Sequence, residues 1–247
     1  MIGKVIITMT VRQSINKVRA KFYNIVTNYN FIKKSSIILI AVYFTLLLIA
    51  VIIAALWGSY GYTIRTRMIS DLGGSRYTPA PIIFDIASIF AGTMTIPLTF
   101  YIEDLFAPLP TRKNIGEQHF SRLRFRLSSN AFFFSLMGNI GYIFVGIFSE
   151  DRDAPLLDFA SYHDVVSFFS FTGFAFGAFF IGWIVVLYKT KIPKVFGIYG
   201  IIGPPTMLFI FLYTMEALWE WILLFSILLW IIPLIYMMLR MPELRPN

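Results

Sequence analysis

Residues Tyr142 to Leu187 read YIFVGIFSEDRDAPLLDFASYHDVVSFFSFTGFAFGAFFIGWIVVL, and this stretch decides the fold class. It consists of an apolar segment, an acidic interruption and a second apolar segment. A helix needs about 20 consecutive apolar residues to cross the hydrocarbon core of a membrane. The stretch therefore predicts two membrane-spanning helices joined by an acidic loop. That loop contains Glu150, Asp151, Arg152, Asp153, Asp158, His163 and Asp164.

The composition of the whole chain agrees with a membrane protein. Of its 247 residues, 57% are hydrophobic and only 14% are charged, whereas about 25% of the residues of a soluble domain are charged. Cysteine is absent, which excludes disulfides, a thiolate nucleophile and a zinc site built from cysteine. The net charge of +8 could suggest nucleic acid, but we expect no such partner because in membrane proteins the location of charge matters more.

Six apolar segments of spanning length are present, and we expect an all-α integral membrane protein with a bundle of six transmembrane helices. The segments are Ser36–Trp57, Ile82–Ile102, Ala131–Phe148, Val165–Tyr188, Val195–Met215 and Trp221–Leu239. We therefore divide the chain into a basic arm (1–35), a transmembrane domain (36–240) and a short tail (241–247).

The arm preceding the first span has the pattern of a basic amphipathic helix. Its apolar residues recur at spacings of three and four, and its cations lie off this stripe. Such a helix lies in the membrane interface, with its cations near anionic headgroups; the alternative is a helix packed on the ends of the bundle. The stripe consists of Val11, Ile15, Val18, Phe22, Ile25 and Tyr29.

The basic residues predict the orientation of the bundle. Of the 21 Lys and Arg residues, 17 lie in the arm, the tail and the second and fourth connections. Cytoplasmic loops of membrane proteins carry an excess of Lys and Arg. We therefore expect a protein of a cell membrane that has both termini on the cytoplasmic side. The acidic loop and the first and fifth connections are then external.

The external connections bring several polar residues to one rim of the bundle. The candidate functional residues are Asp71, Asp85, His163, Asp164, Glu216 and Glu220. Arg65, Arg67 and Arg76 are candidate contacts for lipid phosphates or for these carboxylates. Asp85 lies about one turn inside the second span, where a carboxylate is costly, so we expect it to pair with one of these arginines. Asp71-Leu72-Gly73-Gly74 reads as a turn, in which the glycines allow positive φ and Asp71 bonds nearby amides.

Three interpretations of this rim remain open. Carboxylates with one histidine could bind Ca²⁺ or Mn²⁺, but no EF-hand spacing is present, and we assign no metal. A hydrolase could use His163 as its base, but no G-x-S-x-G motif is present, and we assign no catalytic residue. The third interpretation, a structural cap that holds the loops down, is favoured. No cofactor is expected, because the spans contain neither a histidine to ligate haem nor a lysine to bind retinal.

Glycines recur at helical spacing inside the spans, where small residues let helix backbones approach closely. We expect these positions to be the contacts between the helices. They are Gly138, Gly141, Gly173, Gly177, Gly182, Gly197, Gly200 and Gly203.

Short motifs between Ser36 and Leu239 resemble the prokaryotic membrane family called domain of unknown function 998 (DUF998), and more distantly the DRAM and Frag/Sfk group of six-span proteins. They are Ile69-Ser70-Asp71-Leu72-Gly73, Phe84-Asp85, Ala91-Gly92, Gly146-Ile147-Phe148-Ser149-Glu150, His163 and Glu216 to Glu220. The family pattern has an amide-type residue at the position of Asp85. The family has no established activity, and its distant relatives imply roles in lipid remodelling, lipid-kinase recruitment and autophagy.

The favoured hypothesis is a non-enzymatic multi-pass membrane protein that binds membrane lipids or acts as an accessory subunit for other membrane proteins. The alternatives are a membrane enzyme acting on a lipid headgroup at the external rim, and a transporter or channel.

Overall fold

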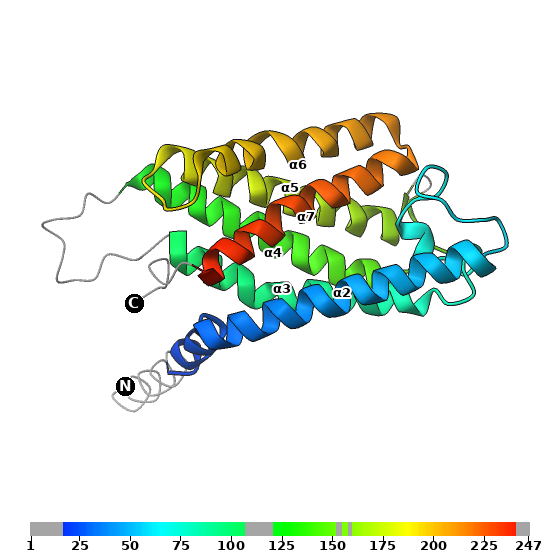
Figure 1. Cartoon of the computed structure of the whole chain (residues 1–247), viewed down its shortest axis with the longest axis horizontal. Coiled ribbons are helices and arrows are strands. Elements are labelled where there is room, and N and C mark those ends of the chain that lie inside the picture. The colour runs from blue at the N-terminus through cyan, green and yellow to red at the C-terminus, as the bar shows by residue number, and fades with distance from the viewer. Residues whose placement is uncertain (1–16, 107–120, 152–154, 158–159, 241–247) are drawn as a thin grey trace, which may run out of the picture.

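The computed structural model describes residues 17–106, 121–151, 155–157 and 160–240. In this part of the chain, six helices are long and apolar enough to cross a membrane, which confirms the predicted fold class (Figure 1). They are α2 (Tyr29–Trp57), α3 (Ile82–Phe106), α4 (Arg122–Ile147), α5 (Tyr162–Leu187), α6 (Lys194–Thr214) and α7 (Ala217–Arg240). The acidic loop forms a small antiparallel hairpin of β1 (Pro155–Leu157) and β2 (Ala160–Ser161).

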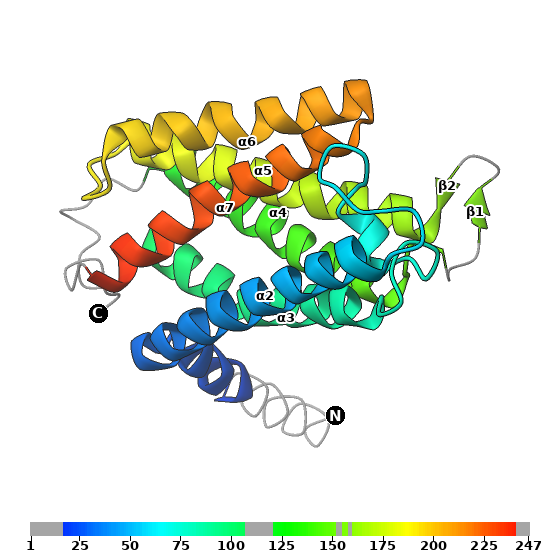
Figure 2. The same cartoon turned by 45° about the vertical axis from the view of Figure 1, so that its right-hand side comes forward.

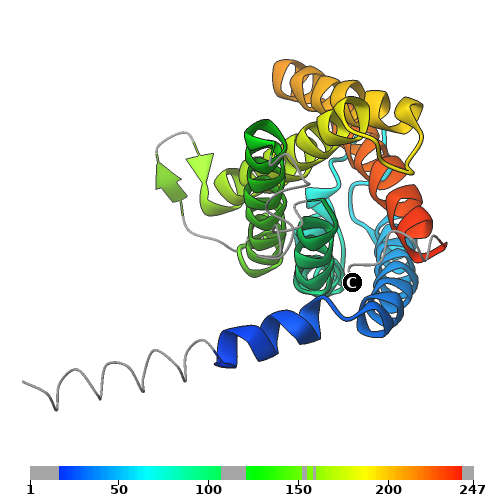
Figure 3. The same ribbon diagram turned by 90° about the vertical axis from the view of Figure 1, so that its left-hand side faces the viewer.

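The helices form a ring in which each one packs against the next in sequence (Figure 3). Helix α7 also packs against α5, whereas its approach to α2, where the ring closes, is looser than the contacts between consecutive helices. Helix α2 begins and α7 ends at the same end of the bundle, which we call the tail end (Figure 1). The opposite end, which carries residues 58–81 and the hairpin, is the loop end.

The arm is separated from the first span by a short break. Residues 17–26 are helical, and α2 starts at Tyr29 rather than at Ser36, because the side chain of Asn28 accepts a hydrogen bond from the amide of Phe31 at 3.1 Å. The predicted stripe through Tyr29 is therefore interrupted, and the two helices point in different directions (Figure 2). Residues 1–16 lie outside the described part of the chain.

Within the described part of the chain, the apolar face of the arm is largely exposed. Val18 is 69% exposed and Phe22 is 51% exposed. The arm is nevertheless attached to α3, because the hydroxyl of Tyr23 donates to Oδ1 of Asp104 at 3.0 Å. An uncovered apolar face favours a helix lying in the membrane interface over one packed on the bundle.

The predicted span glycines lie at contacts between helices, except Gly203, whose nearest neighbour is Tyr199 of the same helix. A Cβ atom built on Gly173 of α5 would lie 2.3 Å from the amide nitrogen of Gly138 in α4. A Cβ atom on Gly182 of α5 would lie 2.6 Å from the carbonyl oxygen of Gly197 in α6. These helices therefore approach at backbone distance, which only a residue without a side chain permits.

The first connection folds back into the loop end of the bundle. Its centre is the 3-10 helix η1 (Ser70–Gly73), whose four residues are all buried. The residues of the predicted turn form this 3-10 helix without using positive φ: Gly74 has φ −92°, and the only glycine with positive φ among the described residues is Gly61. Asp71 does bond a nearby amide, that of Met68. The segment therefore acts as a plug between the helix ends rather than as an exposed turn.

Candidate functional site

Four of the six predicted rim residues are buried at the loop end. The exposed fractions are 8% for Asp71, 3% for Asp85, 2% for His163 and 3% for Glu220. They come from η1 and from the first turns of α3, α5 and α7, so the ring of helices and the folded-back loop bring them to the same end of the bundle. The other two predicted rim residues, Asp164 and Glu216, are exposed.

Asp164 has a local structural role. Its carboxylate accepts a hydrogen bond from the amide of Ser161 at 2.9 Å, and the hydroxyl of Ser161 accepts one from the amide of Asp164 at 3.1 Å. This reciprocal pair is a capping box that starts α5. The carboxylate of Asp164 therefore caps the N-terminus of α5.

Two of the buried carboxylates hold the plug in place through backbone amides. Oδ2 of Asp71 accepts from the amide of Met68 at 3.0 Å, and Oε2 of Glu220 accepts from the amide of Ile69. The neighbouring indole of Trp221 donates to the carbonyl oxygen of Arg67 at 3.2 Å. Two consecutive residues at the start of α7, Glu220 and Trp221, thus hydrogen-bond to the backbone of the first connection.

His163 ties the start of α5 to the end of α4. Its Nδ1 lies 2.6 Å from the carbonyl oxygen of Phe148, and its Nε2 lies 2.9 Å from Oε2 of Glu150. A carbonyl oxygen can only accept, so Nδ1 carries a hydrogen. Nε2 and the carboxyl group then share a proton, which makes Glu150 a partner of the rim, although the sequence reasoning placed it only in the acidic loop.

The environment of Asp71 changes its acidity. Burial raises the pKa of Asp71 from 3.8 to about 6, and the nearby charge of Glu150 acts in the same direction. The hydrogen bond from Met68 and the positive charges of Arg67 and Arg76 oppose this rise in pKa. Asp71 is therefore a carboxyl group that changes charge close to neutral pH.

The arginines of the first connection lie on aromatic rings. The guanidinium carbon of Arg67 is 4.7 Å from the ring centre of Tyr77, and that of Arg76 is 5.3 Å from the ring centre of Tyr60. These are cation–π distances. Arg65 is exposed. The two stacked arginines stabilise the loop above the plug.

Asp85 lies beneath the plug, where a Cβ atom on Gly73 would come within 3.2 Å of its Oδ1. Its pairing with one of the loop arginines stays a prediction. Among the described residues, no group of three or more His, Asp and Glu side chains is arranged to hold a metal ion. The contacts of Asp71, Glu220, His163 and Asp164 all fix loops and helix ends, which supports the interpretation of the rim as a structural cap.

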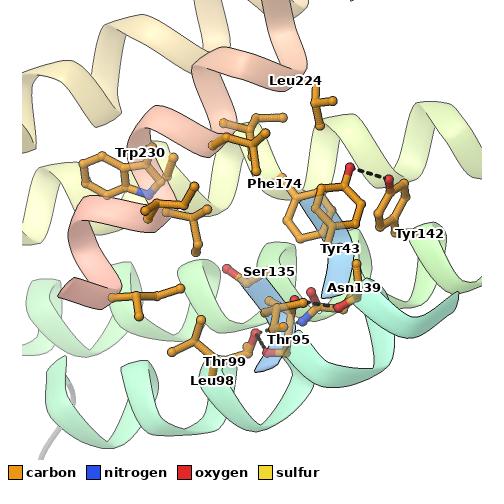
Figure 4. Close-up of a pocket in the computed structure, with 18 of the residues that line it drawn as sticks. Tyr43, Thr95, Leu98, Thr99, Ser135, Asn139, Tyr142, Phe174, Leu224 and Trp230 are labelled. Atoms are coloured by element: carbon orange, nitrogen blue, oxygen red, sulfur yellow. Dashed lines mark hydrogen bonds between the residues drawn. The ribbon is translucent and has the colours of Figure 1, made fainter. Parts of the chain in front are cut away.

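A second site, which the sequence reasoning missed, lies in the middle of the bundle. A cavity of about 110 Å³ is enclosed by α2, α3, α4, α5 and α7 (Figure 4). Its wall is mostly hydrocarbon and aromatic, with contributions such as Leu98, Phe174, Leu224 and Trp230. The uncharged polar residues on its wall are Tyr43, Thr95, Thr99, Ser135, Asn139, Tyr142 and Ser170.

The cavity lies where the ring of helices closes least tightly. Its wall includes Ile40 and Phe44 of α2 and Ile231 and Ile232 of α7, which are all partly or fully accessible from outside. The cavity is therefore bounded toward the surface by the seam between α2 and α7. The sequence signals that accompany it are an amide, Asn139, in the third span and two threonines four residues apart in the second; the burial of Asn139 is visible only in the structure.

Comparison with known proteins adds no relative: no family model, no curated protein and no solved structure matches this chain. The resemblance to the six-span family therefore remains an expectation.

Proposed function

We propose that the protein is a non-enzymatic, lipid-binding protein of a cell membrane, and that its central cavity holds an apolar lipid segment. The observation that carries this proposal is the cavity of about 110 Å³ at the seam between α2 and α7. Ligand sites are typically concave and mainly apolar, with a few polar groups that orient the ligand. The wall of this cavity fits that description.

The surroundings of the cavity favour a ligand that enters from the bilayer. At the loop end the bundle is filled by the plug, whose Leu72 is fully buried. The partly accessible wall residues lie instead on α2 and α7, along the length of two helices of spanning composition. A molecule dissolved in the hydrocarbon core would meet this seam directly.

The same observations weigh against the two alternatives. An enzyme acting at the external rim would need His163 and two carboxylates to face one open point, whereas His163 and Glu220 are buried and bonded to loop and helix ends. A transporter or channel for ions would line its path with ionisable groups, and none of the described residues that line the cavity is Asp, Glu, Lys, Arg or His.

The proposed membrane orientation and partners are argued from the sequence. We propose that both termini face the cytoplasm, that the arm lies on the cytoplasmic surface with its cations near anionic lipids, and that the partners are membrane lipids. Arg65 is an exposed cation at the opposite end, and we propose that it contacts lipid phosphates there. A role as an accessory subunit of a membrane complex is compatible with the same cavity.

The experiment compares two variants of α3 with the same substitution. Thr95 lines the cavity and Thr93 is exposed on the same helix. Protein released from lipid nanodiscs is analysed by native mass spectrometry for retained lipid. We expect Thr95→Phe to lose a lipid that both the parent and Thr93→Phe retain. A parent protein without any retained lipid, or equal retention by both variants, would overturn the proposal.

A further inference from the structure

Several polar groups of the cavity wall have hydrogen-bond partners within the protein, whereas one buried amide oxygen has none. The hydroxyls of Tyr43 and Tyr142 are hydrogen-bonded to each other at 2.8 Å. The hydroxyl of Thr95 donates to the carbonyl oxygen of Ala91 at 2.6 Å. These groups therefore present little unused hydrogen-bonding capacity to a ligand. The exception is the amide of Asn139 (Figure 4).

The neighbours of Asn139 fix the orientation of its amide. Nδ2 of Asn139 lies 2.8 Å from the hydroxyl of Thr99, and that hydroxyl lies 3.2 Å from the carbonyl oxygen of Thr95. The hydroxyl of Thr99 has only one hydrogen, which goes to the carbonyl oxygen, so toward Asn139 it can only accept. The donor Nδ2 must therefore face Thr99, and Oδ1 faces away from it.

Oδ1 of Asn139 is an acceptor without a partner among the described residues, although Asn139 is fully buried at the cavity wall. Buried polar groups are almost always hydrogen-bonded, and an exception calls for a missing partner. The missing partner must be a hydrogen-bond donor. It must also be small or carried on an apolar body, because the rest of the wall is mainly hydrocarbon.

The described wall residues are uncharged, and this further restricts the chemical class of the ligand. An ammonium donor would be an unpaired buried cation, because no carboxylate lines the cavity. A phosphate headgroup would be an unpaired buried anion, because no Lys or Arg lines it either. A neutral hydroxyl is the simplest lipid donor that brings no charge into the cavity and leaves no further polar group to satisfy.

We infer that the cavity binds a lipophilic alcohol, a single apolar chain whose hydroxyl donates a hydrogen bond to Oδ1 of Asn139. This inference rests on the proposed function. A volume of about 110 Å³ suits one chain rather than the two chains of a phospholipid. Asn139 lies in α4 eight residues before its last residue, Ile147, which places this hydroxyl about 12 Å from the loop end of that helix. The polar end of the ligand is thus buried inside the bundle.

The test compares two ligands that differ only in the donor. Hexadecanol carries a hydroxyl, and its methyl ether has the same chain without a donor. Each is titrated as a competitor of a fluorescent fatty alcohol bound to the protein in nanodiscs. For the parent we expect hexadecanol to bind about tenfold more tightly than the ether, which corresponds to about 1.4 kcal/mol. Equal affinities would overturn the inference while leaving lipid binding itself intact.

A variant then assigns the preference to Asn139. Leucine has nearly the shape of asparagine but no acceptor, so we expect Asn139→Leu to bind the alcohol and the ether equally. The control is Thr93→Val on the exposed face of α3, which should keep the preference of the parent. A preference that survives in Asn139→Leu would overturn the assignment. If that variant does not fold, the comparison of the two ligands on the parent still decides the inference.

Discussion

Glu220 shows what a buried carboxyl group does at the loop end. It is 3% exposed, and its Oε2 accepts from the amide of Ile69 in the plug. A buried amide that loses its acceptor retains its desolvation cost, typically about 1–3 kcal/mol. The contact therefore stabilises the folded-back position of the first connection.

We expect Glu220→Leu to lower the free energy of unfolding by about 1–3 kcal/mol, measured by thermal unfolding in a mild detergent. Limited proteolysis within residues 58–81 should become faster at the same time. Glu220→Gln retains an acceptor oxygen for Ile69 and should have a smaller effect on both measurements. Equal stability of Glu220→Leu and the parent would contradict the role given to this hydrogen bond.

Asp71 makes the stability of the protein depend on pH. Its pKa in the folded state is about 6, above its ordinary value of 3.8. The folded state therefore binds the proton of Asp71 more tightly than the unfolded state does. This contribution to stability is fully present below pH 3.8 and is lost as the pH rises through about 6.

The prediction is tested on Asp71→Asn, which keeps an acceptor for the amide of Met68 but has no titrating group. From about pH 4 to about pH 7, the melting temperature of the parent should fall relative to that of the variant. The groups that face Asp71, among them Glu150, Arg67 and Arg76, are present in both proteins, so the difference isolates Asp71. A difference that does not vary with pH, or varies in the opposite direction, would contradict the raised pKa.

At the scale of single residues, the sequence allowed the important charged residues to be predicted but not the important neutral polar ones. A carboxylate near a span must find partners, which drew attention to Asp71, Asp85 and Glu220. Asn139 carries no charge, and its importance depends on which helices surround it and on the orientation of its amide. Those are properties of the packed bundle.

At the scale of elements, the contact between α4 and α5 depends on two glycines that face each other. A Cβ atom on Gly173 would lie 2.3 Å from the backbone nitrogen of Gly138. Backbone atoms cannot move aside without shifting a whole helix, whereas the end of a side chain can. A substitution that adds a Cβ atom at Gly173 should therefore lower the stability of the protein more than one whose new Cβ atom meets only a side chain.

We expect Gly173→Ala to destabilise the protein by about 1–3 kcal/mol or more, measured by the midpoint of denaturation in detergent. The matched control is Gly203→Ala in α6, where the new Cβ atom would meet only the ring of Tyr199 from the same helix. The hydroxyl of that ring is bonded to Ser226, but a side chain shifts at lower cost than a helix backbone, so the control should lose less stability. A larger loss for Gly203→Ala would show that the glycine contact is not the critical one.

The elements themselves were predictable because hydrophobic length is a strong signal. All six spans were found, with ends that differ by several residues where polar side chains extend the helix, as at Arg122 in α4. The break at Asn28 was missed because an N-cap side chain inside an apolar stripe does not alter its periodicity. The plug was missed because two glycines in a row more often mark an exposed turn.

At the scale of the whole molecule, the topology can be tested with single cysteines, because the chain contains none of its own. Arg65 at the loop end and Lys191 at the tail end are both exposed. We expect a membrane-impermeant maleimide to label Arg65→Cys in intact cells, and Lys191→Cys only after the membrane is opened. Labelling of both from the same side would contradict the three spans, α3, α4 and α5, that separate them.

The ring order of the helices also bears on how the protein is made. Because each helix packs on the one before it, a chain leaving the ribosome can add its spans one by one to a growing sheet of helices. The central cavity does not exist until α7, the last span, is inserted and meets α2 across the seam. A chain that ended before Ala217 would leave the polar wall around Asn139 without the cover that α7 gives it.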